Sequence, residues 1–186
     1  MTEIRHLTRD ELDAELDGIS QSPSDGGELQ MIVRRPDVDE RDILETGALT
    51  AAAGLVGDNW RHRSTSSTDD GSPKPDQQLT LMNARVIGLV AREKKRWPLA
   101  GDQLFVDLDL SAANLPPRTR LKLGSAIIEI TAESHTGCRK FGARFGLPAL
   151  KFINGREVHD LRLRGIYAKV VQDGVIRVGD RLLKID

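Results

Sequence analysis

The chain has 186 residues, and its 27 lysines and arginines nearly balance its 28 aspartates and glutamates, which gives a formal net charge of −1. This balance and an aromatic content of 4% argue against a nucleic-acid partner, because nucleic-acid binding uses a basic surface and aromatic stacking. Since the sequence has no apolar run near the roughly 20 residues of a membrane span, no secretory signal and one cysteine, we expect a cytoplasmic protein with a reduced thiol.

The first predicted element is an N-terminal helix. Thr8 and Glu11 have the spacing of a capping box, in which each side chain accepts a hydrogen bond from the other residue's backbone N–H. Apolar residues follow at helical intervals, and the loop-forming run SQSPSDGG then ends the helix. We therefore predict a helical extension over residues 1–27 and a main domain over residues 28–186.

Short strands dominate the predicted main domain. Their apolar and polar residues alternate, as expected where one face of a strand is buried. The segments are ELQMIVRRP (28–36), QLTLM (78–82), FVDLDL (105–110), LKL (121–123), AIIEIT (126–131) and RLLKI (181–185). The segment ILETGALTA (43–51) fits either a strand or a helical turn, and its pattern does not separate the two.

The clearest local signal lies in YAKVVQDGVIRVG, residues 167–179. Two apolar-rich runs flank Asp173 and Gly174, and Asp-Gly is a preferred pair for the tight turn of a β-hairpin. We therefore predict a hairpin with these two residues at its tip.

Helices are predicted between the strands. Asn83 precedes ARVIGLVAREKK and can cap this helix at its N-terminus. Lys94, Lys95 and Arg96 would then lie in the last turn, where cations complement the helix dipole. The segments CRKFGARFG and PALKFINGREVH also have helical patterns.

The order of these elements favours a β-barrel. Strands and helices do not alternate regularly, which argues against a doubly wound parallel sheet. The predicted fold class is therefore mostly β with peripheral helices (α+β), in a closed or half-closed barrel. The polar loop STSSTDDGSPKPDQ, residues 64–77, is long for a compact domain, and such loops are either functional lids or disordered.

Chemistry is expected around Cys138, the only cysteine of the chain. Thr136 can cap the helix that follows, which would place Cys138 in the first turn, where backbone N–H groups favour an anion. Arg139, Lys140 and Arg144 add positive charge nearby. Together these features favour the thiolate, which is both a nucleophile and a metal ligand.

The residues leave other interpretations of Cys138 open. A free cysteine often fills a core, and Phe141 at helical spacing fits that role. His135 and Cys138 have the His-x-x-Cys spacing of zinc ligands, but a structural zinc site needs four ligands and no second pair follows. His62 or His159 could act as the base of a nucleophile–base pair with Cys138, if the fold brings them close.

A second basic cluster, Arg61, His62 and Arg63, precedes the polar loop. A solvated turn explains any one of these residues. Since arginine binds phosphate through two parallel hydrogen bonds, the cluster is also a candidate anion clamp. The sequence has no glycine-rich phosphate-binding motif, so an anion site would depend on these two basic clusters.

A series of short motifs occurs in a characteristic order: Gly-Leu-Val-Gly-Asp (54–58), Cys-Arg-Lys (138–140), Arg-Phe-Gly (144–146), Arg-Gly-Ile-Tyr-Ala (164–168) and Val-Gly-Asp (178–180). Together they resemble the MOSC domain, the module named after the C-terminal part of molybdenum-cofactor sulfurases. The resemblance is closest to the small stand-alone bacterial members and covers roughly residues 30–186.

The resemblance implies a barrel-like, mostly β fold and identifies Cys138 as the functional cysteine. In MOSC proteins that thiol is proposed to carry sulfur as a persulfide or to bind molybdenum in a pterin cofactor, and some stand-alone relatives reduce N-hydroxylated compounds. The implied partners are the molybdenum cofactor or a sulfur-donor protein, and a separate reductase. The cations expected to contact the cofactor are Arg61, Arg63, Arg139, Lys140 and Arg144.

Two positions depart from the family pattern. Asp102-Gln103 stands where stand-alone members have Glu-Asn, and GDNWRH (57–62) has two residues more than the usual Gly-Asp-Arg-His. The first departure suits a second hypothesis, a MOSC fold that binds a partner or an anion without catalysis. A third hypothesis is a thiol redox sensor, which would use glutathione or another chain because this sequence has no second cysteine.

Overall fold

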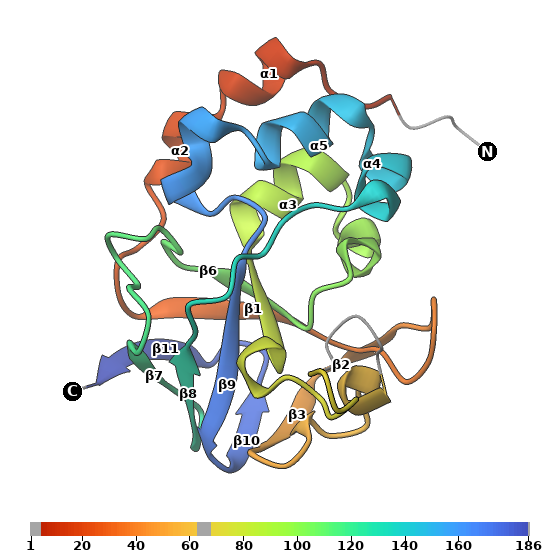
Figure 1. Ribbon diagram of the computed structural model, residues 1–186. Coiled ribbons are helices and arrows are strands. Elements are labelled where there is room, and N and C mark those ends of the chain that lie inside the picture. Colours follow the sequence, from red (N-terminus) through yellow and green to blue (C-terminus); the bar gives the residue numbers. More distant parts are fainter. Residues whose placement is uncertain (1–4, 63–67, 186) are drawn as a thin grey trace.

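The structure is a computed structural model that describes residues 5–62 and 68–185 (Figure 1). Its strands are β1 (Gly27–Arg34), β2 (Asp42–Leu44), β3 (Thr46–Thr50), β4 (Gly54–Leu55), β5 (Leu79–Asn83), β6 (Leu104–Asp107), β7 (Arg120–Leu123), β8 (Ala126–Ile130), β9 (Ile166–Gln172), β10 (Gly174–Arg177) and β11 (Arg181–Ile185). Its α-helices are α1 (Arg9–Asp13), α2 (Leu16–Ser20), α3 (Ala84–Ala91), α4 (Arg139–Phe145) and α5 (Leu147–Ile153). Short 3₁₀ helices are η1 (Asn59–His62), η3 (Pro75–Gln77), η4 (Lys94–Ala100) and η5 (Arg156–Leu161).

A closed barrel forms the centre of the fold. Among the described strands, the order of pairing is β1, β11, β7, β8, β9, β5 and β6. The ring closes because β6 pairs with β1. Neighbours are antiparallel except β5 and β6, which run parallel. Strand β2 pairs with β1 outside the ring, and β10, β3 and β4 form a small second sheet. The predicted mostly β barrel with peripheral helices is confirmed.

Two apolar clusters stabilise this arrangement. The first fills the barrel interior, and the second lies between the barrel and the helices, which gather on one side of it (Figure 1). Strand β8 shows the predicted alternation, because Ala126, Ile128 and Ile130 are buried and the residues between them are half-buried. Strand β5 is buried at every position, since both of its faces are covered. None of the helices in the described part of the chain has the length and apolar character that a membrane crossing requires.

The N-terminal segment contributes to the helical layer. The predicted capping box is present, since Thr8 N donates to Glu11 Oε2 at 2.8 Å and Glu11 N donates to Thr8 Oγ1 at 3.3 Å. The helix divides into α1 and α2, which contact α5 and α3 respectively. Leu12 is fully buried in the cluster beneath the helices. The segment therefore packs on the rest of the protein through apolar contacts.

Helix α3 is shorter than predicted. Asn83 caps it as expected, because its Oδ1 accepts from Arg85 N at 2.8 Å. The helix ends at Ala91, and Arg92 has a left-handed φ of 63°. The basic residues 94–96 therefore lie in η4 and not in the last turn of α3. This change of direction buries Trp97, whose ring packs 5.8 Å from that of Phe105.

The predicted hairpin at residues 167–179 is wrong. Strand β10 pairs with β3 and not with β9, which pairs with β8 and β5. Asp173 accepts a hydrogen bond from Ala51 N at 2.8 Å, and Gly174 packs so closely on the backbone of Ala126 that a Cβ atom would clash. Asp-Gly thus forms a corner that moves the chain from the barrel to the second sheet. The ambiguous segment 43–51 supplies strand β3 to this sheet and most of β2 to β1.

Candidate functional site

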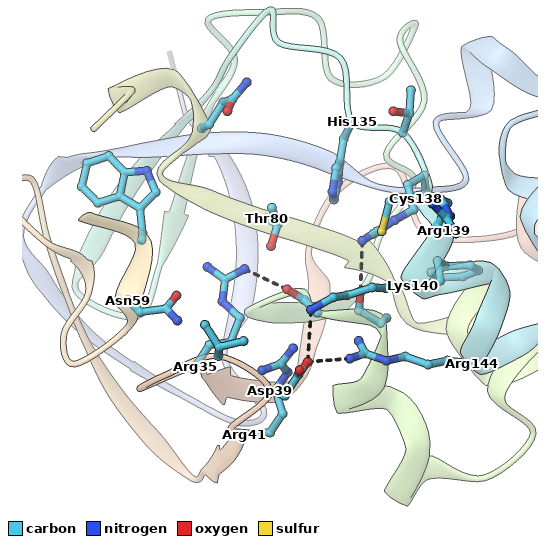
Figure 2. A pocket seen from close by; sticks show the side chains of 18 of the residues that line it. Arg35, Asp39, Arg41, Asn59, Thr80, His135, Cys138, Arg139, Lys140 and Arg144 are labelled. Atoms are coloured by element: carbon cyan, nitrogen blue, oxygen red, sulfur yellow. Dashed lines mark hydrogen bonds and ion pairs between the residues drawn. The ribbon is translucent and has the colours of Figure 1, made fainter. Parts of the chain in front are cut away.

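A pocket of about 770 Å³ lies where the barrel meets α4. Its lining comes from segments distant in the sequence: the β1–β2 loop, η1, β5, the turn before β6, the segment from His135 through α4, and the start of β9. Figure 2 shows Asn59 and Cys138 on opposite sides of the pocket, with Thr80 and Arg35 between them. A volume of this size is typical of small-molecule sites.

Cys138 is exposed and lines this pocket (Figure 2). Phe141 and Phe145 of the same helix are buried in the core. The alternative that Cys138 fills the core is therefore wrong, because its side chain is exposed at the pocket. A thiol in this position is accessible to a ligand in the pocket.

The predicted start of α4 is corrected by the structure. Thr136 was predicted to cap this helix. In the structure Cys138 is the N-cap residue and the helix begins at Arg139. The cause is Asn154, whose Oδ1 accepts from Gly137 N at 2.8 Å and whose Nδ2 donates to Gly137 O at 3.1 Å. These two bonds hold Gly137 outside the helix, so Cys138 does not lie in the first turn.

Three predicted cations of α4, Arg139, Lys140 and Arg144, line the pocket with Cys138. Arg144 Nη1 donates to the carbonyl oxygen of Leu99 at 2.8 Å, which holds the guanidinium group against the end of η4. The structure thus brings the thiol and these cations to one wall of the pocket.

A carboxylate of the β1–β2 loop meets the cations of α4. Arg144 Nη2 donates to Asp39 Oδ1 at 2.9 Å, and Lys140 Nζ donates to the same oxygen at 3.4 Å. The charge of Lys140, followed by its hydrogen bond and the effects of Arg144, lowers the pKa of Asp39 below its ordinary value. Asp39 therefore stays ionised and neutralises part of the positive wall.

Two buried arginines of the described residues line the pocket, and the first is Arg35. Its Nε and Nη2 donate to the two carboxylate oxygens of Asp58 at 2.8 and 2.7 Å, and its Nη1 donates to Gly101 O at 2.8 Å. The side chains of Arg35 and Asp58 are 5% and 0% exposed. A buried bidentate pair of this kind has one geometry, so it fixes the loop and η1 relative to each other.

The second buried arginine, Arg164, pairs with Asp102. Its Nη1 donates to Asp102 Oδ2 at 2.7 Å and its Nη2 donates to Ala100 O at 3.1 Å. Its guanidinium carbon lies 5.3 Å from the centre of the Phe141 ring. Burial raises the pKa of Asp102, and the charge of Arg164 opposes that rise. This pair joins the start of β9 to the turn before β6.

The departure at Asp102-Gln103 has a structural explanation. Both residues are fully buried, and neither lines the pocket. Gln103 Oε1 accepts from Thr80 N at 2.8 Å and from Thr80 Oγ1 at 2.7 Å, and its Nε2 donates to Gln78 O at 3.2 Å. The two side chains therefore hold in place Thr80 and Arg164, which line the floor of the pocket together with Arg35, and do not line the pocket themselves.

The candidate histidines occupy different places. His135 lines the pocket, where its ring centre lies 4.5 Å from that of Tyr167 and its Nδ1 lies 3.8 Å from Asp102 Oδ1. His62 also lines the pocket, whereas His159 is 80% exposed outside it and is therefore not a partner for Cys138.

The wall opposite Cys138 is formed by η1. Trp60 and Asn59 line the pocket there, and the buried atoms Trp60 Nε1 and Asn59 Oδ1 have no hydrogen-bond partner within the described residues. Arg61 is exposed and is not among the lining residues, and Arg63 lies outside the described residues. The two residues that lengthen the Gly-Asp-Arg-His motif thus supply this wall.

Sequence reasoning missed Arg35, Arg41 and Arg164, which also line the pocket. Arg35 directly follows the apolar strand β1 and precedes a proline, and Arg164 precedes Gly165. Charged residues at the ends of buried strands are a signal for such a site, but their partners lie far away in the sequence.

Comparisons with known proteins agree with this architecture. The family model described as MOSC domain matches residues 68–183. No curated protein matches the sequence significantly.

Solved structures with the same fold include three bacterial proteins. The YuaD protein of Bacillus subtilis aligns with a TM-score of 0.59 and 13% identity over 84% of this chain and 93% of its own. YiiM of Escherichia coli aligns with a TM-score of 0.53 and 15% identity over 86% of this chain and 70% of its own. YiiM of Geobacillus stearothermophilus aligns with a TM-score of 0.51 and 14% identity over 88% of this chain and 74% of its own. At these identities the likeness shows the fold alone.

Proposed function

Because the chain belongs to the MOSC domain family, we propose that its pocket binds the molybdenum cofactor, with the thiolate of Cys138 as the protein ligand of the metal. The observation that carries this proposal is the position of Cys138, an exposed thiol on a pocket of about 770 Å³ beside three cations of α4. The pterin cofactor is anionic, so these cations have an evident partner.

The residues present fit such a cofactor. Within the described residues, no group of three or more His, Cys, Asp or Glu side chains could hold a bare metal ion. In this proposal Cys138 is a single protein ligand, and the cofactor brings the remaining ligands of the metal. A soft thiolate ligand suits that role.

When bound, the cofactor supplies oxygen-atom transfer, which suits the reduction of N-hydroxylated compounds with electrons from a separate reductase. The chain's own residues shape the pocket around that chemistry. The pairs Arg35–Asp58 and Arg164–Asp102 hold its floor rigid. His135, whose ring is tilted by 43° against that of Tyr167, lines the pocket and presents its imidazole ring to a ligand there.

A second candidate is sulfur transfer through Cys138. The same exposure favours it, because the Cys138 thiolate would have to reach the outer sulfur of a donor persulfide, whose S–S bond breaks as the donor thiolate leaves. The two functions differ in what the purified protein carries, since one predicts molybdenum and the other predicts additional sulfur on one residue.

The test is elemental analysis and intact mass of protein purified from a molybdenum-replete host. The proposal predicts molybdenum and a fluorescent pterin oxidation product in the wild type, and loss of both in Cys138→Ala. Ser134→Ala is the matched control, since Ser134 is exposed nearby and does not line the pocket. A mass increase of one sulfur without metal supports sulfur transfer, and neither modification in the wild type refutes both functions.

A further inference from the structure

The carboxylate of Asp39 lies against two cations of α4 at the wall of the pocket. Arg144 and Lys140 both donate to Asp39 Oδ1, at 2.9 and 3.4 Å, and these contacts cross from α4 to the β1–β2 loop (Figure 2). All three residues line the pocket. A phosphate oxygen would meet the same two donors there.

The tip of the β1–β2 loop lies between two anchored arginines. Arg35 is fixed by its buried pair with Asp58, and Arg41 Nε donates to Pro98 O at 3.2 Å. Residues 37–40, between these anchors, are all exposed. A short tip of this kind can move while both of its ends stay in place.

The backbone conformation at Asp39 is uncommon, and its ion pairs are exposed to water. Its φ of 61° lies in the left-handed region, which residues other than glycine rarely adopt, although aspartate tolerates it better than most. The side chain of Asp39 is 58% exposed, so its ion pairs with Lys140 and Arg144 are partly screened by water. Breaking them therefore costs little.

We propose that Lys140 and Arg144 form a phosphate site and that Asp39 is its internal competitor, which a phosphate group of the ligand displaces. Phosphate wins this exchange because it carries more charge and more acceptor oxygens than one carboxylate. The inference deepens the proposed function, and it rests on that function only for the source of the phosphate. The source is either the terminal phosphate of the cofactor or another phosphate compound.

The test measures the affinity of inorganic phosphate by calorimetry, at constant ionic strength, for the wild type, Asp39→Asn and Asp37→Asn. Asp37 is the matched control, because it lines the pocket from the same loop while its Oδ1 accepts from Val38 N at 2.6 Å. Both variants remove one negative charge from the loop. We expect Asp39→Asn to bind phosphate about 2- to 10-fold more tightly, from the usual strength of exposed ion pairs, and Asp37→Asn to gain less than half of that factor.

A double mutant separates competition from general electrostatics. If Asp39 competes for Lys140, the gain from Asp39→Asn shrinks in a Lys140→Met background. Equal gains in the Asp39 and Asp37 variants, or no gain in Asp39→Asn, would overturn the proposal.

Molybdenum and pterin content after dialysis identifies the source of the phosphate. If Asp39→Asn retains more of both than the wild type, the cofactor supplies the displacing phosphate. If Asp39→Asn binds inorganic phosphate more tightly and neither protein holds molybdenum, the internal competitor stands and the cofactor proposal fails.

Discussion

The most demanding prediction concerns Asp58→Asn in the pocket floor. From the described residues, the Asp58 carboxylate accepts five hydrogen bonds, and each of these partners is an N–H donor. Oδ1 accepts from Arg35 Nη2, Trp60 N and Gln103 Nε2, and Oδ2 accepts from Arg35 Nε and Arg35 N. An asparagine keeps the shape but turns one oxygen into an NH₂ group, which would face donors in either orientation.

The magnitude follows from the burial of the pair. The side chain of Asp58 is 0% exposed and that of Arg35 is 5% exposed, so the variant leaves a guanidinium charge buried without its counter-ion. Removing one partner of a buried pair destabilises a protein by about 3–5 kcal/mol. For a chain of 186 residues that corresponds to a Tm lower by about 6–20 °C, at about 2–4 °C per kcal/mol.

The assay is chemical and thermal unfolding followed by circular dichroism. Asp160→Asn is the matched control, since the side chain of Asp160 is 90% exposed, and we expect it to change the free energy of unfolding by less than about 0.5 kcal/mol. In the double variant Arg35→Met with Asp58→Asn, the loss is smaller than the sum of the single losses, because no charge remains unpaired. A loss below about 1 kcal/mol in Asp58→Asn would show that the floor does not depend on this pair.

Two further predictions address the loop and the corner of the barrel. Lys140→Met raises the pKa of Asp39 toward its ordinary value in a carboxyl NMR titration, whereas Lys151→Met, another exposed lysine, leaves it unchanged. An unchanged pKa of Asp39 in Lys140→Met would contradict the pairing. Because the pKa of Asp39 is lowered by folding, its contribution to stability is present above the ordinary aspartate pKa and disappears as the pH falls through the lowered value. Gly174→Ala lowers the free energy of unfolding by about 1–3 kcal/mol, because a Cβ atom there meets the backbone of the neighbouring strand. Gly18→Ala, where a Cβ atom meets nothing within 4 Å, should be neutral or stabilising, and equal effects at the two glycines would contradict the packing.

Local signals in the sequence predicted the elements better than their connections. The spacing of Thr8 and Glu11 predicted a real capping box, and the alternation in residues 126–130 predicted a barrel strand. The same kind of signal failed at Asp173-Gly174, because an Asp-Gly pair favours a tight turn whether the next strand returns to its neighbour or crosses to another sheet. Pairing depends on contacts with strands far away in the chain.

The candidate site was predictable on one wall only. Cys138 and the cations of α4 lie close together in the sequence, so their shared position on a helix was foreseeable. The partners of Arg35 and Arg164 lie 23 and 62 residues away, and only the closed barrel brings them together. Arg61 was expected at the pocket, but η1 presents Asn59, Trp60 and His62 there.

The central proposal is that the sulfur atom of Cys138 binds the metal of a pterin cofactor. X-ray absorption at the molybdenum edge tests it most directly, using the holoprotein and the variant Cys138→Ser. We predict that the number of sulfur ligands around molybdenum falls by one in the variant. An unchanged sulfur shell in a variant that still holds molybdenum would contradict the account.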